Sequence, residues 1–389
     1  MAYWFETSDC RLEDFVRSME TARAADPGSD WTNDNAHGIP IYDCHDLRAR
    51  LVSDTGRKLL RDDFARTLRH GAGIIVLKGC FEDPDTVDAA TAEFTEIMAE
   101  ERASGAGQGD HFGTNARIWN AAEKLCLRAP DVFVRYYGNE IVGLAAESWL
   151  GPNYQVTSQT NLVHPGGKGQ IGHRDYHLGF MASEDAARYP IVAHQFSAFL
   201  TLQGAIAHCD MPVESGPTKY LPYSQHYEPG YIACTMPDFV AHFEAEYVQL
   251  PLAKGDAVFF NPAVLHGAGD NVTDDIERLA NLLQVSSAFG RAIEVVDRAA
   301  MCEAAYPSLL SHIGKGDLSD DQIEAAISAI AEGYPFPTSL DRDPPVGGLA
   351  PMSQADILRE ALTRGFKHAA FVRELEANTA RRAPGMNRC

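Results

Sequence analysis

Basic residues are scarce in this chain of 389 residues. Lysine and arginine together number 33, against 54 aspartates and glutamates, so the formal net charge at pH 7 is -21. A protein this acidic repels nucleic acid and anionic membrane surfaces, because both carry dense negative charge. We therefore expect neither nucleic acid nor a membrane as a partner. An anionic small molecule is compatible with this charge, because a local basic pocket can lie inside an acidic shell.

Long apolar runs and paired cysteines are also lacking. No uninterrupted apolar stretch reaches the roughly 20 residues that a membrane-spanning helix needs. The first residues show no basic segment followed by an apolar core, so no signal peptide is expected. None of the 8 cysteines belongs to a CxxC pair, which argues against a structural zinc site, an iron–sulfur cluster and a disulfide framework. These features predict a cytoplasmic protein.

The pattern of secondary-structure signals changes at Gly151-Pro152. Residues 1–150 carry mainly helical patterns, with one buried strand at 73–78. Residues 151–290 contain short β-rich runs separated by Gly, Pro and Asp, which predicts a sandwich, jelly roll or barrel. Residues 291–389 are helical again. We expect one structural domain, in which a helical N-terminal part packs on a central β core and a helical C-terminal extension follows.

The individual elements can be placed from their periodicity. The expected helices are 11–25, 61–69, 83–101, 121–136, 139–149, 293–312, 319–332 and 353–377. The expected strands of the central region are 154–163, 196–207, 218–221, 256–260 and 281–288. The order of helices, strands and helices indicates an α+β protein with a mainly β core.

Two histidines and one aspartate in the β-rich region have the spacing of metal ligands. Residues i and i+2 of an extended strand point to the same face, so His173 and Asp175 can both offer a ligand atom to one ion. About ninety residues later, His266 ends an apolar run and is followed by Gly267. Two histidines and one carboxylate form the facial triad of non-haem Fe(II) oxygenases, which leaves coordination positions open.

An arginine, Arg278, lies twelve residues after His266. Residues 269–275 indicate a hairpin turn between His266 and Arg278. An even offset across such a turn predicts that Arg278 lies on the neighbouring strand and faces the same interior as His266. The planar guanidinium of arginine pairs with a carboxylate through two parallel hydrogen bonds. Arg278 is therefore a candidate to bind the distal carboxylate of an oxoacid chelated to the metal.

Simpler explanations exist for each part of this pattern. The chain has 14 histidines, so an isolated HxD can arise by chance. The combination of HxD, the block Gly255 to Gly267 and Arg278 is much more specific. Two alternatives stay open: a metal-binding β-helix that acts as a sensor or binding protein without turnover, and a cupin-like metal-dependent isomerase or hydrolase. The second alternative usually employs more histidine ligands and does not require Arg278.

With these motifs, the sequence resembles the phytanoyl-CoA dioxygenase family of Fe(II)/2-oxoglutarate oxygenases. The resemblance covers about Phe64 to Phe289. Its motifs are Phe64-Ala-Arg with Gly73-Ile-Ile-Val-Leu-Lys-Gly, His173-x-Asp175, Glu214-Ser-Gly-Pro-Thr-Lys-Tyr-Leu-Pro-Tyr-Ser-Gln-His226, and Gly255-Asp256 through His266-Gly267 to Arg278. Two positions depart from the family pattern, namely Tyr223 in place of Gly and Ala268 in place of a Ser that contacts 2-oxoglutarate.

The resemblance implies a fold, a set of cofactors and a ligand set. The fold would be a double-stranded β-helix, a cupin-like jelly roll flanked by N- and C-terminal helices. The cofactors would be Fe(II), 2-oxoglutarate as cosubstrate, and O2. The metal ligands, and with them the catalytic centre, would be His173, Asp175 and His266, and Arg278 would bind the 5-carboxylate of 2-oxoglutarate. Four further residues would contact the cosubstrate, although strand polarity or core packing explains them equally well: Gln159, Asn161, Thr218 and Phe199.

The resemblance also bears on the reaction and the substrate. Halogenating relatives lack the carboxylate that Asp175 supplies, so its presence favours hydroxylation of a small-molecule metabolite, or a related desaturation or cyclisation. His177 lies at i+4 from His173 and would share its face in an extended strand, and Lys168 lies in the Gly-rich segment 167–172. Both are candidate substrate contacts. The helical extensions could cover the core or build a homodimer.

Overall fold

A computed structural model describes residues 3–32, 34–105, 115–345, 347 and 349–383. The protein is a mixed α+β structure with one sheet of eight strands and one of three. In the large sheet the order is β1 (Asn35–Ala36), β2 (Ile39–Asp43), β3 (Ile74–Lys78), β9 (Ala257–Phe260), β6 (Thr201–Ala207), β11 (Arg278–Ser286), β5 (Gln155–Val163) and β4 (Ala116–Ile118). The small sheet has the order β10 (Leu265–Gly267), β7 (Lys219–Leu221) and β8 (Val248–Gln249).

The helices of the described chain have the following bounds. They are α1 Leu12–Ala25, α2 Cys44–Arg50, α3 Asp54–His70, α4 Pro84–Ser104, α5 Ala121–Arg128, α6 Pro130–Tyr137, α7 Glu140–Leu150, α8 Ser183–Ala186, α9 Ile191–Phe199, α10 Gly230–Ala233, α11 Pro237–Glu246, α12 Arg298–Lys315, α13 Asp320–Ile330, α14 Gln354–Arg364 and α15 His368–Arg382. Short 3-10 helices lie at Thr7–Asp9, Val213–Ser215 and Ser224–His226. In the described part of the chain, no helix is both long enough and apolar enough to cross a membrane.

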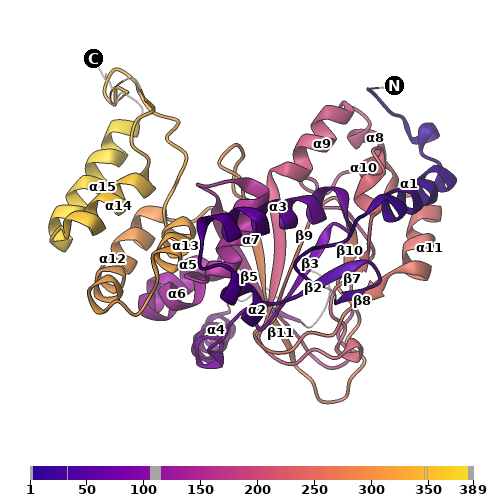
Figure 1. Cartoon of the computed structure of the whole chain (residues 1–389), viewed down its shortest axis with the longest axis horizontal. Coiled ribbons are helices and arrows are strands. Elements are labelled where there is room, and N and C mark those ends of the chain that lie inside the picture. Colours follow the sequence, from indigo (N-terminus) through magenta and orange to yellow (C-terminus); the bar gives the residue numbers. More distant parts are fainter. Residues whose placement is uncertain (1–2, 33, 106–114, 346, 348, 384–389) are drawn as a thin grey trace.

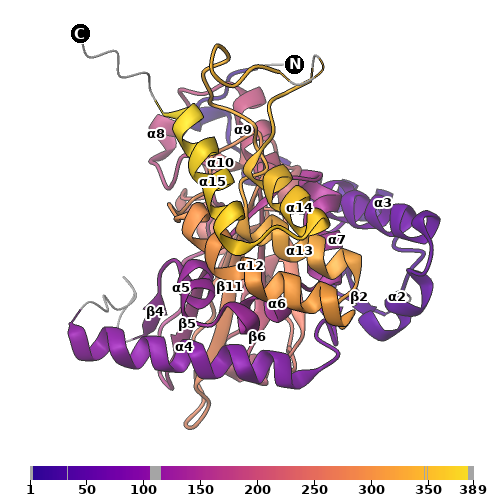
Figure 2. The same ribbon diagram turned by 90° about the vertical axis from the view of Figure 1, so that its left-hand side faces the viewer.

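The large sheet separates two hydrophobic cores. Side chains alternate between its faces, because successive residues of a strand point in opposite directions. On β11, Leu283 and Val285 belong to the larger core, whereas Ala280 belongs to the core between the sheets. The larger core is covered by α5, α6, α7, α12 and α13, with α14 and α15 packed outside them (Figures 1 and 2). The two faces of each strand therefore serve different purposes, one for packing and one for the site.

The N-terminal region contributes more strands than the sequence predicted. Only 73–78 was expected to be a strand, yet β1, β2 and β4 also come from the first 150 residues. β2 runs parallel to β3, and β3 pairs with β9 of the central region. The prediction of a single strand was wrong because these strands are short: β2 and β4 pair with segments distant in sequence, β3 and β5, and β1 is a two-residue strand that pairs with β2.

Several element boundaries differ from the predictions for local reasons. The run 196–207 was expected to be one strand, but its first part is the end of α9, whose buried residues follow a helical spacing. The expected helix 121–136 is divided, since Pro130 begins α6. The expected helix 353–377 is also divided, because Gly365 ends α14 in the left-handed conformation. β11 begins at Arg278, three residues before the expected 281.

Candidate metal centre

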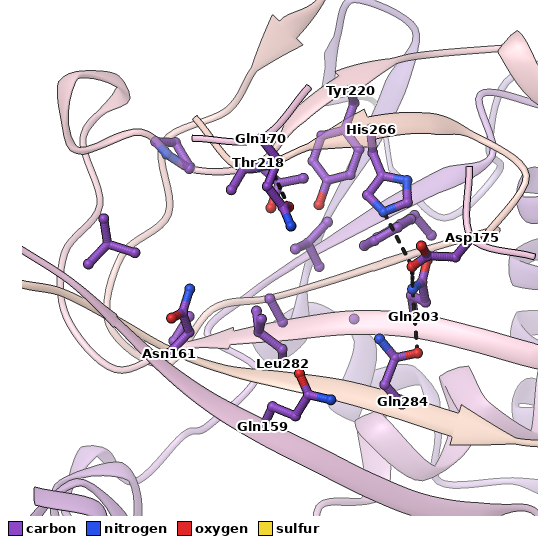
Figure 3. A pocket seen from close by; sticks show the side chains of 18 of the residues that line it. Gln159, Asn161, Gln170, Asp175, Gln203, Thr218, Tyr220, His266, Leu282 and Gln284 are labelled. Atoms are coloured by element: carbon purple, nitrogen blue, oxygen red, sulfur yellow. Dashed lines mark hydrogen bonds and ion pairs between the residues drawn. The ribbon is translucent and has the colours of Figure 1, made fainter. Parts of the chain in front are cut away.

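A cavity of about 440 Å³ lies between the two sheets. One wall consists of inward-facing side chains of β5, β6, β9 and β11, and the opposite wall includes residues of β7 and β10 (Figure 3). On β11 the lining residues are Arg278, Ala280, Leu282 and Gln284, which follow the two-residue period of a strand. The strand register therefore decides which polar groups reach the cavity.

His173, Asp175 and His266 converge at one end of this cavity. Their candidate ligand atoms all lie within 4.8 Å of one another. His173 and His266 form an isolated antiparallel bridge, in which each backbone N–H donates to the carbonyl of the other residue, at 2.9 and 3.0 Å. This bridge brings the two imidazole rings to a centroid separation of 4.6 Å. The predicted triad is thus assembled from two segments that are far apart in the sequence.

Both imidazoles are oriented by the backbone. Nδ1 of His173 lies 2.8 Å from the carbonyl oxygen of Ile171, and Nδ1 of His266 lies 2.9 Å from that of Val264. A carbonyl oxygen only accepts hydrogen bonds, so each Nδ1 is the protonated donor and each Nε2 keeps its lone pair. The Nε2 atoms lie 3.6 Å and 3.7 Å from the two carboxylate oxygens of Asp175. Two imidazole lone pairs and one carboxylate therefore face a common point.

The charge state of His266 suits a metal ligand. Its side chain is buried, and burial lowers the pKa of His266 from 6.5 to about 4, with the nearby His173 acting in the same direction and Asp175 opposing it. A neutral imidazole is the form that binds a metal ion.

The segment that contains Ser224 supports the strand of His266: the hydroxyl of Ser224 accepts a hydrogen bond from the backbone N–H of Leu265 at 2.7 Å. Tyr223, where the family pattern has Gly, keeps the left-handed backbone conformation with a φ of 68°.

Asp175 is held by Gln203 of the large sheet, which in turn contacts Gln284. The Gln203 side-chain amide donates to Oδ2 of Asp175, and the same nitrogen lies 3.4 Å from the amide oxygen of Gln284 (Figure 3). Gln203 on β6 and Gln284 on β11 are direct cross-strand partners. Because a carboxylate only accepts hydrogen bonds, its contact with the amide nitrogen fixes which way the Gln203 amide points.

Arg278 lies buried at another part of the cavity and has no acidic partner among the described residues. Within the described residues, its only hydrogen bond runs from Nη1 to the carbonyl oxygen of Gly269, at 3.4 Å. Burial lowers the pKa of Arg278 to about 10, because the charged guanidinium is removed from water. An arginine that remains cationic in this setting is suited to an anionic group entering the cavity.

Further unpaired polar atoms border the same cavity. The hydroxyl of Tyr220 and Oδ1 of Asn161 are buried without a hydrogen-bond partner, and both residues line the cavity together with Thr218 and Arg278. Buried polar groups normally have partners, so such atoms indicate a missing polar ligand. The triad, the arginine and these atoms fit a metal ion together with a small dicarboxylate.

The structure separates the weaker predicted contacts into two groups. Gln159, Asn161, Thr218 and Lys168 line the cavity. Lys168 is exposed, and its ammonium lies 3.9 Å from Asp270.

Two of the predicted contacts do not line the cavity. Phe199 ends α9 and stacks on Trp149, with ring centroids 5.0 Å apart. His177 lies within a turn closed by the hydrogen bond from Gly179 N–H to the Tyr176 carbonyl, so the extended register expected from His173 onward does not continue. Nδ1 of His177 instead lies 3.4 Å from the Thr201 hydroxyl.

The expected pairing of the strands that carry His266 and Arg278 was wrong. β10, which carries His266, pairs with β7, whereas β11, which begins at Arg278, pairs with β5 and β6. The segment between these residues crosses from the small sheet to the large one instead of closing a hairpin. The two side chains nevertheless line the same cavity, from different sheets.

Sequence reasoning missed several residues of the site. Gln203, Gln284, Tyr220 and Phe180 all line the cavity. The two glutamines lie on strands that carry other polar residues as well, such as Thr201 on β6 and Asn281 on β11, so the sequence does not single them out. Tyr220 and Phe180 give no signal either, since an aromatic residue in a β-rich region is usually part of a core.

Comparisons with known proteins give one family match and several structural similarities. The chain is similar to the solved structure of the epimerase SnoN in complex with Fe3+, alpha ketoglutarate and nogalamycin RO, with 20% identity, a TM-score of 0.43, and coverage of 60% of this chain and 86% of that one. It is also similar to the non-heme alpha ketoglutarate dependent carbocyclase SnoK from nogalamycin biosynthesis, with 20% identity, a TM-score of 0.43, and coverage of 62% and 86%. No curated protein sequence matches the chain. The family model of Phytanoyl-CoA dioxygenase (PhyH) matches residues 70–280, which is more than half of the chain. The chain therefore belongs to the phytanoyl-CoA dioxygenase family.

Proposed function

We propose that the protein is a non-haem Fe(II)/2-oxoglutarate-dependent dioxygenase that hydroxylates a small-molecule metabolite. The observation that carries the proposal is one cavity that contains both the His173, Asp175 and His266 cluster and a buried arginine without an acidic partner among the described residues. Metal-binding proteins without turnover, and isomerases that use no 2-oxoglutarate, have no need of this second feature. Membership of the phytanoyl-CoA dioxygenase family supports the same reaction class.

The triad would hold Fe(II). Two neutral imidazoles and a carboxylate supply nitrogen and oxygen donors, which is the ligand set of non-haem Fe(II) oxygenases. The backbone carbonyls that accept from both Nδ1 atoms keep the Nε2 atoms directed at the ion, and Gln203 keeps Asp175 in place. Such outer contacts restrict ring and carboxylate rotation, so the site is formed before the metal binds.

Arg278 would hold the 5-carboxylate of 2-oxoglutarate. Arg278 lines the same cavity as the triad, and Tyr220, with its unpaired hydroxyl, and Thr218 line it too. A carboxylate at Arg278 would balance a buried positive charge that no described residue neutralises. Asn161 would supply a further polar contact from β5, and the position of Gln159 two residues away suits a contact nearer the substrate.

Fe(II), 2-oxoglutarate and O2 together supply oxidation of a C–H bond, in which one oxygen atom enters the substrate as a hydroxyl and the other enters succinate as CO2 is released. The protein's own residues bind and orient the reactants and exclude water. Asp175 occupies the carboxylate position, which favours hydroxylation over halogenation. The apolar side chains of Val258, Leu282 and Phe260 line the cavity and limit the access of bulk water.

The enclosing sheets support a finer description of the fold. We propose that the two sheets form the double-stranded β-helix of the family, because strands of both line one cavity. The N-terminal strands extend the large sheet, and the C-terminal helices pack on its outer core. These contacts support one structural domain spanning the helical and β-rich parts.

An anaerobic titration of the metal-free protein with Fe(II) and 2-oxoglutarate tests the proposal. The expected result is a weak metal-to-ligand charge-transfer band in the green region of the visible spectrum. The band should be absent in His266→Ala and retained in His164→Ala, since the His164 ring instead contacts Glu277. Fe(II) binding without a band would favour a sensor or an isomerase. Substrate-dependent succinate release then separates an enzyme from a binding protein.

A further inference from the structure

Two large apolar side chains line the cavity while remaining exposed to solvent, which places them at its entrance. Phe180 and Ile293 both line the cavity, yet they are 72% and 64% exposed. Four more large apolar residues that are mostly exposed belong to the same two segments, 171–180 and 287–295: Ile171, Leu178, Phe289 and Val295. Scattered exposed apolar residues are common, but a cluster at the entrance of a cavity marks a binding surface.

Phe180 connects this apolar entrance directly to the metal centre. Its ring meets that of His173 edge to face, with centroids 5.1 Å apart and an interplanar angle of 87°. The second segment approaches the same region, since a Cβ built on Gly290 would lie 3.2 Å from the His177 ring. A molecule whose reacting carbon reaches the triad can therefore contact Phe180 with its remaining part.

An uncharged hydrogen-bond donor lies beside the triad. Gln203 donates toward the amide oxygen of Gln284 at 3.4 Å, which turns Nε2 of Gln284 away from Gln203 (Figure 3). This Nε2 donates to no residue in the described chain, and Gln284 lines the cavity. The amide can therefore donate to an oxygen atom of a bound molecule, and it offers no charge to a carboxylate or an ammonium.

The cations near the entrance already have other contacts. Nη1 of Arg117 donates to Oε1 of Gln159 at 3.2 Å, and the guanidinium lies 5.1 Å from the centre of the Trp119 ring. Lys168 lies close to Asp270. Arg278 would bind the cosubstrate. The other charged residues that line the cavity, within the described chain, either contact neighbouring side chains or belong to the triad. This environment favours an uncharged molecule over a zwitterionic amino acid, whose charges would need partners.

We propose, on the basis of the proposed function, that the substrate is an uncharged molecule with a largely apolar body and at least one carbonyl or hydroxyl oxygen. The apolar body rests on Phe180 and Ile293 at the entrance. The oxygen accepts a hydrogen bond from Nε2 of Gln284, which places a neighbouring carbon at the triad. Phe180 and Ile293 form the rim of the cavity. Shape and apolar contact at this rim select the molecule, and Gln284 sets its orientation.

The rim is tested by binding an uncharged apolar fluorophore, N-phenyl-1-naphthylamine, to the full chain loaded anaerobically with Fe(II) and 2-oxoglutarate. Phe180→Ser and Ile293→Ser should each weaken binding by roughly tenfold, because each removes an apolar contact surface. Val52→Ser is the matched control, since Val52 is an exposed apolar residue between α2 and α3, and it should bind like the wild type. Wild-type affinity in both rim variants would overturn the proposal.

The same variants test whether a second copy of the chain, instead of a small molecule, covers Phe180 and Ile293. Sedimentation of the wild type and the rim variants over a range of concentrations reports self-association. If Phe180→Ser and Ile293→Ser dissociate a dimer while the fluorophore binds as before, the rim is a contact between copies and the proposal is wrong. If all variants have one sedimentation behaviour and only fluorophore binding changes, the rim binds small molecules.

Gln284 is tested with two competitors of nearly equal shape, 2-acetylnaphthalene and 2-ethylnaphthalene, which differ by a carbonyl oxygen. The wild type should prefer the ketone by roughly five- to tenfold, and Gln284→Leu should abolish the preference. An undiminished preference in Gln284→Leu, or displacement of the fluorophore by free leucine more strongly than by the ketone, would overturn the proposal. The charge-transfer band of each variant is recorded in parallel. A missing band in the wild type would contradict the proposed function, whereas fluorophore binding still tests the rim.

Discussion

The side-chain amide of Gln203 donates to the carboxylate of Asp175 from the opposite wall of the cavity, and the amide oxygen of Gln284 lies 3.4 Å from the same nitrogen (Figure 3). Gln203 and Gln284 are register partners on β6 and β11. The orientation of the only carboxylate in the triad thus depends on the pairing of two strands that carry no metal ligand. Gln203 acts on the metal through Asp175 and is a positioning residue.

Replacing Gln203 by Leu should weaken Fe(II) binding by about 10- to 100-fold, the usual effect of removing a residue that orients a metal ligand. The physical reason is that Asp175 would gain rotational freedom and lose a donor. Anaerobic Fe(II) titration followed by calorimetry measures the effect. Gln159→Leu is the matched control, because Gln159 lines the cavity and no hydrogen bond joins it to the triad within the described chain. Equal Fe(II) affinity in Gln203→Leu and the wild type would contradict this role.

Replacing Arg278 by Leu should weaken 2-oxoglutarate binding by roughly a hundredfold and leave Fe(II) binding unchanged, because a charge-assisted pair with a carboxylate is lost. Arg278→Lys should fall between the two, since it keeps the charge and loses the planar fork. Titration of the Fe(II)-loaded protein with 2-oxoglutarate, followed by the charge-transfer band, measures both.

The same substitution carries a second expectation for the protein without cosubstrate. A buried charge without an acidic partner costs free energy, so Arg278→Leu should keep or raise the temperature of unfolding. Normal 2-oxoglutarate affinity in Arg278→Leu would show that the arginine does not bind the cosubstrate. Lower thermal stability together with normal affinity would assign it a structural role.

Replacing Asp175 by Ala should abolish hydroxylation and substrate-dependent succinate release, because one of the three ligands in the cluster, and its only carboxylate, is removed. Product analysis by mass spectrometry, with Fe(II) in excess, measures the loss. Asp270→Ala serves as a control, since Asp270 lies near Lys168 and outside the cluster. Full activity in Asp175→Ala would remove the basis of the triad assignment.

The parts of the site that sequence could predict are those with a chemical and positional signature. The residues of the HxD motif, His266 and Arg278 combine unusual residue types with informative spacing, and the structure places them around one cavity. Gln203 and Gln284 lack such a signature, because their relation depends on the pairing of β6 with β11, which one sequence does not specify. Long-range register is the information that local periodicity omits.

Two wrong placements have the same origin. Phe199 lies in an apolar run that is compatible with a strand and with a helix. In the structure it ends α9, where its ring packs against Trp149. Arg278 was expected beside His266 because a turn between them was read as a hairpin. The segment between them instead connects two sheets. In both cases a tertiary contact determined the outcome among locally equivalent alternatives.

His208 links the outer face of the large sheet to the helices and makes the fold sensitive to acid. Its Nδ1 lies 2.7 Å from the Thr91 hydroxyl on α4, and its Nε2 lies 2.7 Å from the Tyr136 hydroxyl on α6. Burial lowers the pKa of His208 from 6.5 to about 3. On acidification the unfolded chain therefore takes up this proton first, at its ordinary pKa. The stability contributed by the neutral ring is present above about pH 6.5 and is lost as the pH falls toward 3.

Replacing His208 by Gln should reduce the pH dependence of the free energy of unfolding between pH 6 and pH 4 by up to about 1.4 kcal/mol per pH unit, the contribution of one proton. The dependence should not vanish, because burial also lowers the pKa of His194 and His226. At pH 7 the variant should be less stable by about 1–3 kcal/mol, since a buried hydroxyl loses its partner. Urea unfolding at several pH values measures both effects, with the exposed His45→Gln as the control. Equal pH slopes in His208→Gln and the wild type would show that the buried ring is not the group that takes up the proton on unfolding.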